Sequence, residues 1–521
     1  MLRWRIVRRD LVEDHLAQKS HLEHINLKKC GSSKCYRFNF FIMYVSKYPY
    51  IIFREYPDYG YLTDNRNFGY DTQSKSCIKV GDRVISKSGC VFYSVLSDVP
   101  EDVSVIVSRL MSIFINAPYD IIHNDACEFY AELAQGGFVY CNNEYTEWSR
   151  DSYFSYANAE PVELSQVVSD DFAYEDVFGE TQQLTRVQVD VSGFCNEKCV
   201  HCYIPELCKR GLMSLDLFTR IIEQCRDNNV LNITISGGEP MINPNLIEFL
   251  KLCGQNNFSV NLLTNLTLLS DEILHVLVAN PLISVQTSLY SMNEDTHDSI
   301  TRLPGSFKKT IQAIRLLHQH NIPIQINCPI MKQNKDDYSD VMTWAQSMNI
   351  EADSDYLLFG CYDCSKKNLS CRLSLSEVEG VVARQCESGA YVDKIFTEAS
   401  NKQLDENQPI CSVCSASICI SNQGNVYPCE GWQGYSVGSI IESSLLDIWR
   451  FSERVLMLRK LKLSDFPQCL NCNYIRYCSP CLYRNANENL GDFHKVSPYF
   501  CKVAELLKRI VEQEICKRNN S

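Results

Sequence analysis

The sequence predicts an α/β protein whose central domain is a partial (βα)6 barrel of the TIM type. Apolar, β-rich runs alternate with amphipathic stretches in which apolar residues recur near helical spacing. Such alternation is typical of parallel strands joined by right-handed helical crossovers, in a sheet that is open or curved into part of a barrel. The six predicted strands are TRVQVDVS (185–192), NITIS (232–236), SVNLLTN (259–265), ISVQTSL (283–289), PIQINCPI (323–330) and DYLLF (355–359).

A smaller domain is expected before the barrel, over residues 37–145. We predict strands for YIIFREYPDYGYLTDN and CVFYSVL, and helices for PEDVSVIVSRLMSIF and NDACEFYAELAQ. Gly136 and Gly137 then turn the chain into the short strand FVYC, an order that indicates a winged-helix-like α+β domain. Residues 1–36 are expected to be an N-terminal tail, and the segment 146–182, rich in Asp and Glu, an acidic linker.

Composition limits the class of protein, its cellular compartment and its partners. Its 521 residues exceed what one hydrophobic core usually supports, and 45% hydrophobic with 22% charged residues is ordinary for a globular protein. No apolar run is long enough for a signal peptide or a membrane span, so we expect a cytoplasmic protein with no membrane partner. The net charge of -13 disfavours nucleic acid as a partner.

The 27 cysteines divide the chain into two chemical regions. In a reducing cytosol, cysteine clusters indicate metal ligands or redox groups more readily than disulfides. Three cysteines follow the first predicted strand of the barrel, at the carboxyl end where parallel α/β folds place their chemistry. A second group lies at short spacings between residues 411 and 501.

The first group, Cys195, Cys199 and Cys202, supplies three thiolates on one loop. A structural zinc site needs four protein ligands, whereas a [4Fe-4S] cluster held by three cysteines keeps one iron open for a small molecule. The odd number therefore favours an iron with a free coordination position. A zinc site completed by His201 or Cys208, or three unrelated buried thiols, is the alternative.

The motif Cys195-x3-Cys199-x2-Cys202-Tyr203 resembles the signature of the radical S-adenosylmethionine (SAM) enzymes, and the similarity extends along residues 183–360. The segment SGGEP is similar to the glycine-rich segment that receives the methionyl amine of SAM, since glycines let backbone groups approach a ligand closely. The resemblance implies that a reduced [4Fe-4S] cluster cleaves SAM to a radical that abstracts hydrogen from a substrate. The residues that it implies for SAM binding are Tyr203, Gly237, Gly238, Glu239, Thr264, Asn265, Ser288 and Arg302.

Three later segments extend this resemblance. LLTNLTLL and VQTSLYS are similar to the third and fourth strand ends that line the cofactor pocket, and NEDTHDSITRLPGSFKKTIQAI is similar to the family's peptide and sulfatase modifiers. Each segment alone is a weak signal, because a glycine pair is usually a turn and a lone Ser or Asn usually caps a helix. Their order at successive strand ends favours the cofactor site.

The C-terminal cysteines resemble the SPASM extension of radical SAM peptide modifiers. This extension is expected over residues 409–503, after a bridging segment, 361–408, and before a C-terminal helix or tail, 504–521. The spacing between Cys478 and Cys481 is shorter than the family commonly has, and the one before Cys501 is longer. By resemblance, the extension binds two auxiliary [4Fe-4S] clusters with four thiolates each. The ligands expected are Cys411, Cys414, Cys429 and Cys481 for the first cluster, and Cys469, Cys472, Cys478 and Cys501 for the second.

Several assignments in this region stay open. Cys419 could replace Cys411 in the first auxiliary cluster, and two zinc sites of the ribbon kind are the alternative to iron. Glu430 is a tentative catalytic residue, because sulfatase-maturing relatives are proposed to carry an acidic proton acceptor at this point. A solvated surface carboxylate is the other interpretation of Glu430. The thiols of Cys361, Cys364 and Cys371 could form a further metal site, but are more simply buried or incidental.

The N-terminal domain indicates what kind of substrate the protein binds. Its segment SVIVSRLMSIFINAPYDIIHNDACEFYAELAQGGFVY is similar to the peptide-recognition domain of ribosomal-peptide maturases, where a leader peptide adds as an extra strand. A structural cap or dimerisation domain is the alternative, and the acidic second helix disfavours DNA.

Together these features predict a radical SAM oxidoreductase that abstracts hydrogen from a residue of a ribosomally made precursor peptide, with an electron donor such as flavodoxin or ferredoxin. The alternatives are a sulfatase-maturing, formylglycine-generating enzyme and a catalytically silent, cluster-stabilised peptide-binding subunit.

Overall fold

The computed structural model describes residues 43–65, 68, 81–147 and 182–519. The chain divides into two compact units, and the described residues 43–65 and 81–147 belong to the first. Residue 68 and residues 182–519 belong to the second, so the predicted barrel, bridging segment and cysteine-rich extension share one unit. The predicted N-terminal tail and almost all of the predicted acidic linker lie outside the described residues.

In the described residues, the first unit contains two small antiparallel sheets and three helices. In one sheet β1 pairs with β5 and β6, and in the other β3 pairs with β2 and β4. Both predicted helices are present, as α2 and α3, and FVYC forms most of β6. The elements are β1 (Tyr44–Lys47), β2 (Ile51–Glu55), β3 (Tyr59–Asp64), β4 (Arg83–Ser86), α1 (Lys87–Ser94), β5 (Glu101–Asp102), α2 (Val103–Ile113), α3 (Tyr119–Gln135) and β6 (Val139–Asn142).

One predicted strand of this unit is wrong. Most of CVFYSVL, at 90–96, lies in helix α1, although its aromatic and β-branched residues favour a strand. Ser86 caps this helix, because its Oγ accepts a hydrogen bond from the backbone N–H of Gly89 (3.2 Å). Phe92 and Tyr93 are buried in the first unit. Capping and packing therefore outweigh the local strand propensity.

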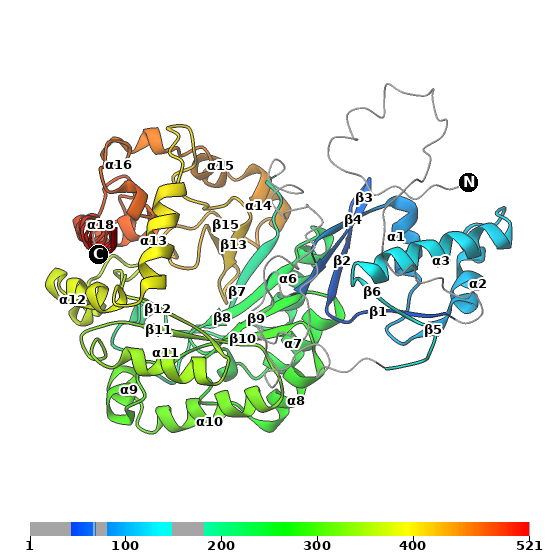
Figure 1. The fold of residues 1–521 in the computed structure, drawn as a ribbon, viewed down its shortest axis with the longest axis horizontal. Coiled ribbons are helices and arrows are strands. Elements are labelled where there is room, and N and C mark those ends of the chain that lie inside the picture. Colours follow the sequence, from blue (N-terminus) through cyan, green and yellow to red (C-terminus); the bar gives the residue numbers. More distant parts are fainter. Residues whose placement is uncertain (1–42, 66–67, 69–80, 148–181, 520–521) are drawn as a thin grey trace. The chain divides into compact units, whose positions relative to one another are not determined.

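The second unit contains a sheet of nine strands in the order β12-β11-β10-β9-β8-β7-β13-β14-β15. Strands β7 to β12 are all parallel, with a helix after each of the first five, and the helices line the outside of the curved sheet (Figure 1). The partial barrel is thus confirmed. Its strands are β7 (Arg186–Ser192), β8 (Asn232–Gly237), β9 (Ser259–Leu263), β10 (Ile283–Ser288), β11 (Ile324–Pro329) and β12 (Glu351–Asp355), and its helices are α6 (Leu215–Asp227), α7 (Leu246–Gln255), α8 (Asp271–Ala279), α9 (Glu294–Thr301), α10 (Ser306–Gln319) and α11 (Tyr338–Ser347).

The sixth strand begins earlier than the sequence predicts. Strand β12 is the polar stretch EADSD, whereas the prediction was the apolar DYLLF at 355–359. Pairing with β11 runs from Gln325–Glu351 to Pro329–Asp355. Because β12 ends the sheet, its side chains are partly or fully exposed and need no apolar pattern. The hydrophobic run that follows it was therefore a misleading signal.

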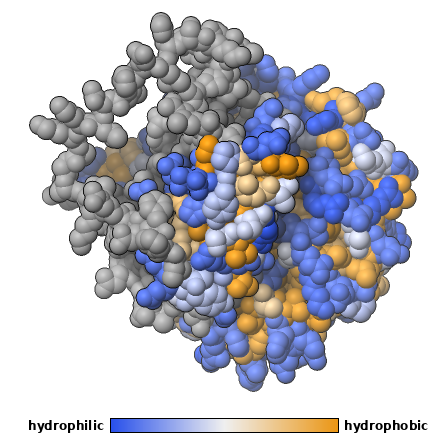
Figure 2. Space-filling view, turned by 90° about the vertical axis from the view of Figure 1, so that its right-hand side faces the viewer, coloured by the Kyte–Doolittle hydropathy of each residue, from blue (hydrophilic) through white to orange (hydrophobic). Residues whose placement is uncertain are grey.

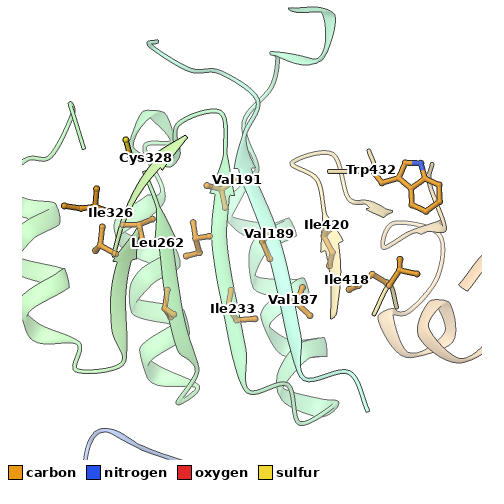
Figure 3. Close-up of a cluster of buried hydrophobic side chains, with 14 of the residues drawn as sticks. Val187, Val189, Val191, Ile233, Leu262, Ile326, Cys328, Ile418, Ile420 and Trp432 are labelled. Carbon is orange, nitrogen blue, oxygen red and sulfur yellow. The ribbon is translucent and has the colours of Figure 1, made fainter. Parts of the chain in front are cut away.

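The two faces of the barrel sheet differ in polarity. Val187, Val189 and Val191 alternate along β7 and are fully buried, in one core cluster with side chains of α6 and α7 (Figure 3). The intervening Gln188, Asp190 and Ser192 lie on the opposite face, because successive side chains of a strand point to opposite sides. The apolar face packs against the helices, so the inner face is left polar and suited to binding ligands.

The cysteine-rich region continues the barrel sheet, which the sequence did not predict. Strand β13 pairs with β7 in parallel, and β14 and β15 follow as antiparallel strands. Helix α18 starts at Pro498, ahead of the predicted C-terminal segment. The elements here are α12 (Leu375–Gln385), α13 (Gly389–Asn401), β13 (Ser417–Ile420), β14 (Asn425–Tyr427), β15 (Gly438–Ser439), α14 (Leu445–Phe451), α15 (Glu453–Arg459), α16 (Pro467–Leu470), α17 (Leu482–Glu488) and α18 (Pro498–Asn519).

None of the described helices combines the length and the apolar character needed to cross a bilayer. On the face drawn in Figure 2, apolar residues form separate small groups among hydrophilic ones.

Candidate active site

A cavity of about 230 Å³ opens at the carboxyl ends of the parallel strands. The loop after β7 contributes three cysteines to its lining, and the ends of β8, β9, β10 and β11 contribute polar residues or glycines. The structure therefore brings together segments that are far apart in the sequence. The predicted site residues that line this cavity are Cys195, Cys199, Cys202, Tyr203, Gly237, Gly238, Thr264, Asn265 and Ser288.

The cysteine loop is held by hydrogen bonds to neighbouring strand and helix ends. The backbone N–H groups of Lys198 and Val200 donate to the carbonyls of Thr301 and Ile300 at the end of α9 (2.9 Å each). Asn196 accepts a hydrogen bond from the side chain of Asn265 after β9 (2.9 Å). These bonds fix the backbone of the loop, so the three thiols have a defined arrangement before any ligand binds.

The three thiols have the chemistry of metal ligands. Burial raises the pKa of Cys195 to about 12, and burial with the charge of Glu197 raises the pKa of Cys199 well above its usual value. Such thiols stay protonated near neutral pH unless a metal stabilises the thiolate. The cavity beside them leaves room for a cluster and a small ligand. The donor set thus fits an iron–sulfur cluster.

The alternative of a zinc site on this loop gains no support from the geometry. Among the described side chains, no three His, Cys, Asp or Glu residues converge on a point that a single ion could occupy. His201 is turned to Tyr290, with 3.0 Å between its Nε2 and the tyrosine hydroxyl, and burial lowers its pKa to about 4. Cys208, the other candidate fourth ligand, is exposed.

The two glycines of the SGGEP segment are needed for packing against the cysteine loop. A Cβ on Gly237 would lie 2.2 Å from the Ser192 carbonyl oxygen, and one on Gly238 would lie 2.3 Å from that of Phe194. The backbone N–H of Gly238 donates to the Ser192 carbonyl (2.7 Å). The structure therefore shows close approach of these glycines to the backbone that carries the first cysteine, and the expected close approach to a ligand stays a prediction.

Two residues expected to bind SAM lie outside the lining of the cavity. Glu239 is fully buried, and its carboxylate accepts hydrogen bonds from the Thr264 hydroxyl (2.7 Å) and the Asn265 backbone N–H (2.8 Å). It therefore ties the ends of β8 and β9 together from behind the cavity. Arg302 ends helix α9 in the left-handed conformation (φ 55°) and does not line the cavity either.

Sequence reasoning missed several polar residues that line the same cavity. Tyr290 lies at the cavity, with its hydroxyl 4.0 Å from the Cys199 sulfur. Lys209 is a cation in the lining. Burial alone would lower the pKa of Lys209, but the charges of Cys202 and Glu206 outweigh that effect and raise it. Tyr290 lies in the segment VQTSLYS, but neither residue was singled out from the sequence, because their positions at the cavity depend on how separate loops fold back over the strand ends.

A second cysteine cavity of about 170 Å³ lies in the C-terminal part of the second unit. Cys469 lies in α16 and Cys501 in the first turns of α18, so the long sequence gap between them is closed by the fold. Burial raises the pKa of both Cys469 and Cys478 to about 11. The predicted ligands that line this cavity are Cys469, Cys472, Cys478 and Cys501, with Cys481 also in the lining.

The thiols predicted to bind the other auxiliary cluster interact electrostatically with one another. Beyond the larger effect of burial, the charge of Cys411 helps to raise the pKa of each of the other three members, Cys414, Cys429 and Cys481. These four thiols are therefore close enough for their charges to interact, and their assignment to one cluster stays a prediction.

Cys419 lies in a different environment. It is buried in β13, with its sulfur 4.0 Å from Asp190 Oδ2 and 3.9 Å from Gln433 Nε2. The charge of Cys429 also helps to raise the pKa of Cys419, so Cys411 and Cys419 both stay candidates for the fourth ligand of the first auxiliary cluster.

The remaining candidate residues, Glu430, Cys361, Cys364 and Cys371, do not come together in a defined site. Glu430 is exposed, in keeping with a solvated carboxylate, and its proton-acceptor role stays a prediction. Cys361 and Cys371 are buried, and the Cys361 sulfur lies 3.8 Å from the Cys202 carbonyl oxygen. Within the described residues, Cys361, Cys364 and Cys371 do not form a three-ligand metal site.

Comparison with known proteins identifies the class of enzyme. Residues 189–345 match the radical SAM superfamily, and residues 411–473 match the SPASM iron–sulfur cluster-binding domain. The protein is therefore a radical SAM enzyme with a SPASM domain. Its cofactors are SAM and a [4Fe-4S] cluster, and its SPASM domain binds auxiliary iron–sulfur clusters.

Several relatives are similar over most of their length. An AdoMet-dependent heme synthase of Methanosarcina barkeri is 25% identical over 60% of this chain and 94% of its own. The subtilosin biosynthesis protein AlbA of Bacillus subtilis is 25% identical over 66% of this chain and 78% of its own. A PqqA peptide cyclase of Gluconobacter oxydans is 24% identical over 61% of this chain and 93% of its own. The structure of Streptococcus suis SuiB with its precursor peptide SuiA shares the fold, with a TM-score of 0.53 at 14% identity over 88% of this chain and 99% of SuiB.

Proposed function

We propose that the protein is a peptide maturase, which modifies a residue of a ribosomally made precursor peptide by radical SAM chemistry. The observation that carries the proposal is the single cavity that the three thiols of the first group share with the glycine segment and the strand-end residues. Two of the relatives act in the biosynthesis of peptide products by their names, and SuiB binds a precursor peptide. These relatives favour a peptide over a small metabolite as substrate.

We assign the cofactors to residues as follows. Cys195, Cys199 and Cys202 would hold the [4Fe-4S] cluster that binds SAM, and Gly237 and Gly238 would border the SAM molecule. When bound, the cluster and SAM supply the one-electron chemistry that abstracts hydrogen from a substrate. An electron donor such as flavodoxin or ferredoxin would reduce the cluster. The auxiliary ligands that we assign are Cys411, Cys414, Cys429 and Cys481 for one cluster, and Cys469, Cys472, Cys478 and Cys501 for the other.

In this mechanism the residues of the protein position the reacting groups and protect them from bulk water. Hydrogen bonds from the cysteine loop to α9 keep the three thiols in place, and Glu239 holds Thr264 and Asn265 at the cavity wall. Burial keeps His201 neutral, so it does not add a second positive charge beside Lys209. The polar inner face of the barrel offers hydrogen-bond partners to substrate and cofactor without exposing them to bulk water.

The function is tested by a mass measurement on a peptide. The anaerobically reconstituted protein, with SAM and dithionite, is expected to form 5′-deoxyadenosine and to change the mass of a peptide encoded by a short open reading frame beside its gene. A peptide carrying a sulfatase motif is expected to gain no aldehyde. Aldehyde formation on that peptide, with no change in the neighbouring one, would favour sulfatase maturation. No 5′-deoxyadenosine from iron-replete protein would favour a silent binding subunit.

We propose that the first unit binds the leader segment of the peptide. Its small antiparallel sheets end in edge strands, β2 and β4 in one sheet and β5 and β6 in the other, and an edge strand can accept an added peptide strand. Deleting residues 1–145 is expected to leave 5′-deoxyadenosine formation intact and to weaken peptide binding, measured by fluorescence anisotropy with a labelled peptide. Undiminished modification of the full-length peptide by the truncated protein would contradict this role.

A further inference from the structure

A second cavity, of about 110 Å³, lies beside the cofactor cavity in the second unit. Gly237, Gly238 and Ile204 border both cavities, so the two spaces are neighbours. The rest of its wall comes from β7, where Asp190 lies, from the loop that follows β7, from Tyr362, and from the region after β13, where Gln433 lies. It is therefore formed between the barrel and the cysteine-rich extension, and none of the cofactor assignments above uses it.

Asp190 is the notable group in this second cavity. Its side chain is on the polar inner face of β7, and the residue is only 8% exposed. Its two carboxylate oxygens accept hydrogen bonds from Gln188 Nε2 (2.9 Å) and Gln433 Nε2 (2.5 Å). Both of these amides are neutral, and the thiol of Cys419 lies 4.0 Å from Oδ2.

The carboxylate of Asp190 has no cationic partner in the part of the chain that the structure describes. None of the ion pairs among those residues includes Asp190. Arg210 also lines the cavity, but it is exposed and forms no ion pair with Asp190. Burial and the charge of Glu430 raise the pKa of Asp190, so its surroundings disfavour an unpaired negative charge. Burying a charge without a counter-ion is unfavourable, and a cation in the cavity would offset that penalty.

We propose that this second cavity receives a cationic side chain of the peptide substrate, lysine or arginine, and that Asp190 is its counter-ion. The inference rests on the proposed peptide substrate and adds the chemical class of the residue that is recognised. Because Gly237 and Gly238 border both cavities, a side chain held by Asp190 lies next to the cofactor cavity. Asp190 thus selects and positions the residue that the cofactor meets.

The test uses small probes, so that it does not depend on turnover. Binding of N-acetyl-lysine amide, N-acetyl-arginine amide and the neutral N-acetyl-norleucine amide is measured by ligand-observed NMR on the reconstituted full-length protein. Wild-type protein is expected to bind at least one cationic probe roughly tenfold more tightly than the neutral one. Asp190→Asn, which keeps the size of the side chain, is expected to lose that preference.

Two further variants keep the test interpretable. Asp216→Asn removes an exposed carboxylate from the first turn of α6 and is expected to retain the preference. Gln433→Ala removes an amide partner but leaves the carboxylate, so it should also retain the preference. Far-UV circular dichroism and iron content confirm that each variant is folded and loaded.

Two results would overturn the inference: equal binding of all probes by wild type, or an unchanged preference in Asp190→Asn. Loss of the preference in Gln433→Ala as complete as in Asp190→Asn would also overturn it, because the amide would then carry recognition. Peptide modification is read separately by mass. A failed peptide assay with intact cation preference therefore rejects the peptide proposal alone, and the reverse pattern rejects only the role of Asp190.

Discussion

Cys199→Ala protein is expected to form no 5′-deoxyadenosine above background when supplied with SAM and dithionite. Cys199 is the second of the three cysteines in the loop, and it lines the cofactor cavity. Two thiolates cannot hold the cluster as three do, so this cluster is lost and SAM has no iron to bind. Iron content is expected to fall by about one cluster, with the auxiliary clusters retained. Liquid chromatography of the nucleoside product and iron analysis measure both effects.

The matched control for this experiment is Cys516→Ala. Cys516 is an exposed thiol in α18 and lines neither cysteine cavity. Its replacement is expected to leave nucleoside formation and iron content at wild-type values. Wild-type nucleoside formation by Cys199→Ala protein, or a stoichiometric zinc ion that the variant loses, would contradict the cluster assignment.

Gly238→Ala is expected to destabilise the protein and to weaken SAM binding together. The added Cβ would lie 2.3 Å from the carbonyl oxygen and 2.7 Å from the carbonyl carbon of Phe194, which are backbone atoms just before the first cysteine. The cysteine loop must shift to relieve this overlap, at a cost of about 1–3 kcal/mol in the free energy of unfolding. Displacement of the loop also disturbs the cavity wall. Thermal unfolding and equilibrium dialysis with labelled SAM measure the two effects.

Gly380→Ala provides the comparison for this clash. Gly380 lies inside helix α12, and a Cβ there would meet no atom within 4 Å. Alanine is favoured over glycine in a helix by roughly 0.5–1 kcal/mol, so this variant is expected to be slightly more stable and to bind SAM normally. If both glycine variants bound SAM as wild type does, the packing role assigned to Gly238 would be wrong.

The sequence predicted those parts of the site whose chemistry depends on the spacing of residues that are close in the chain. The three cysteines Cys195, Cys199 and Cys202 and the segment SGGEP are each contained in one short stretch of chain, and nine of the eleven residues predicted for the first cluster and SAM line one cavity. Glu239 does not line the cavity, and the sequence could not show this, because it shows that a carboxylate is present but not which way it points. Asp190 and Tyr290 were missed, since each is an isolated residue whose neighbours come from distant segments.

The sequence by itself determined the alternation of strands and helices and the two cysteine groups, because periodicity and ligand spacing are properties of neighbouring residues. Only the tertiary structure decided that β13 joins the barrel sheet beside β7, that α18 brings Cys501 to Cys469, and that Glu239 turns away from the cavity. The physical reason is that pairing and burial between distant segments depend on the packing of the whole unit. A local pattern such as DYLLF or CVFYSVL cannot report that packing.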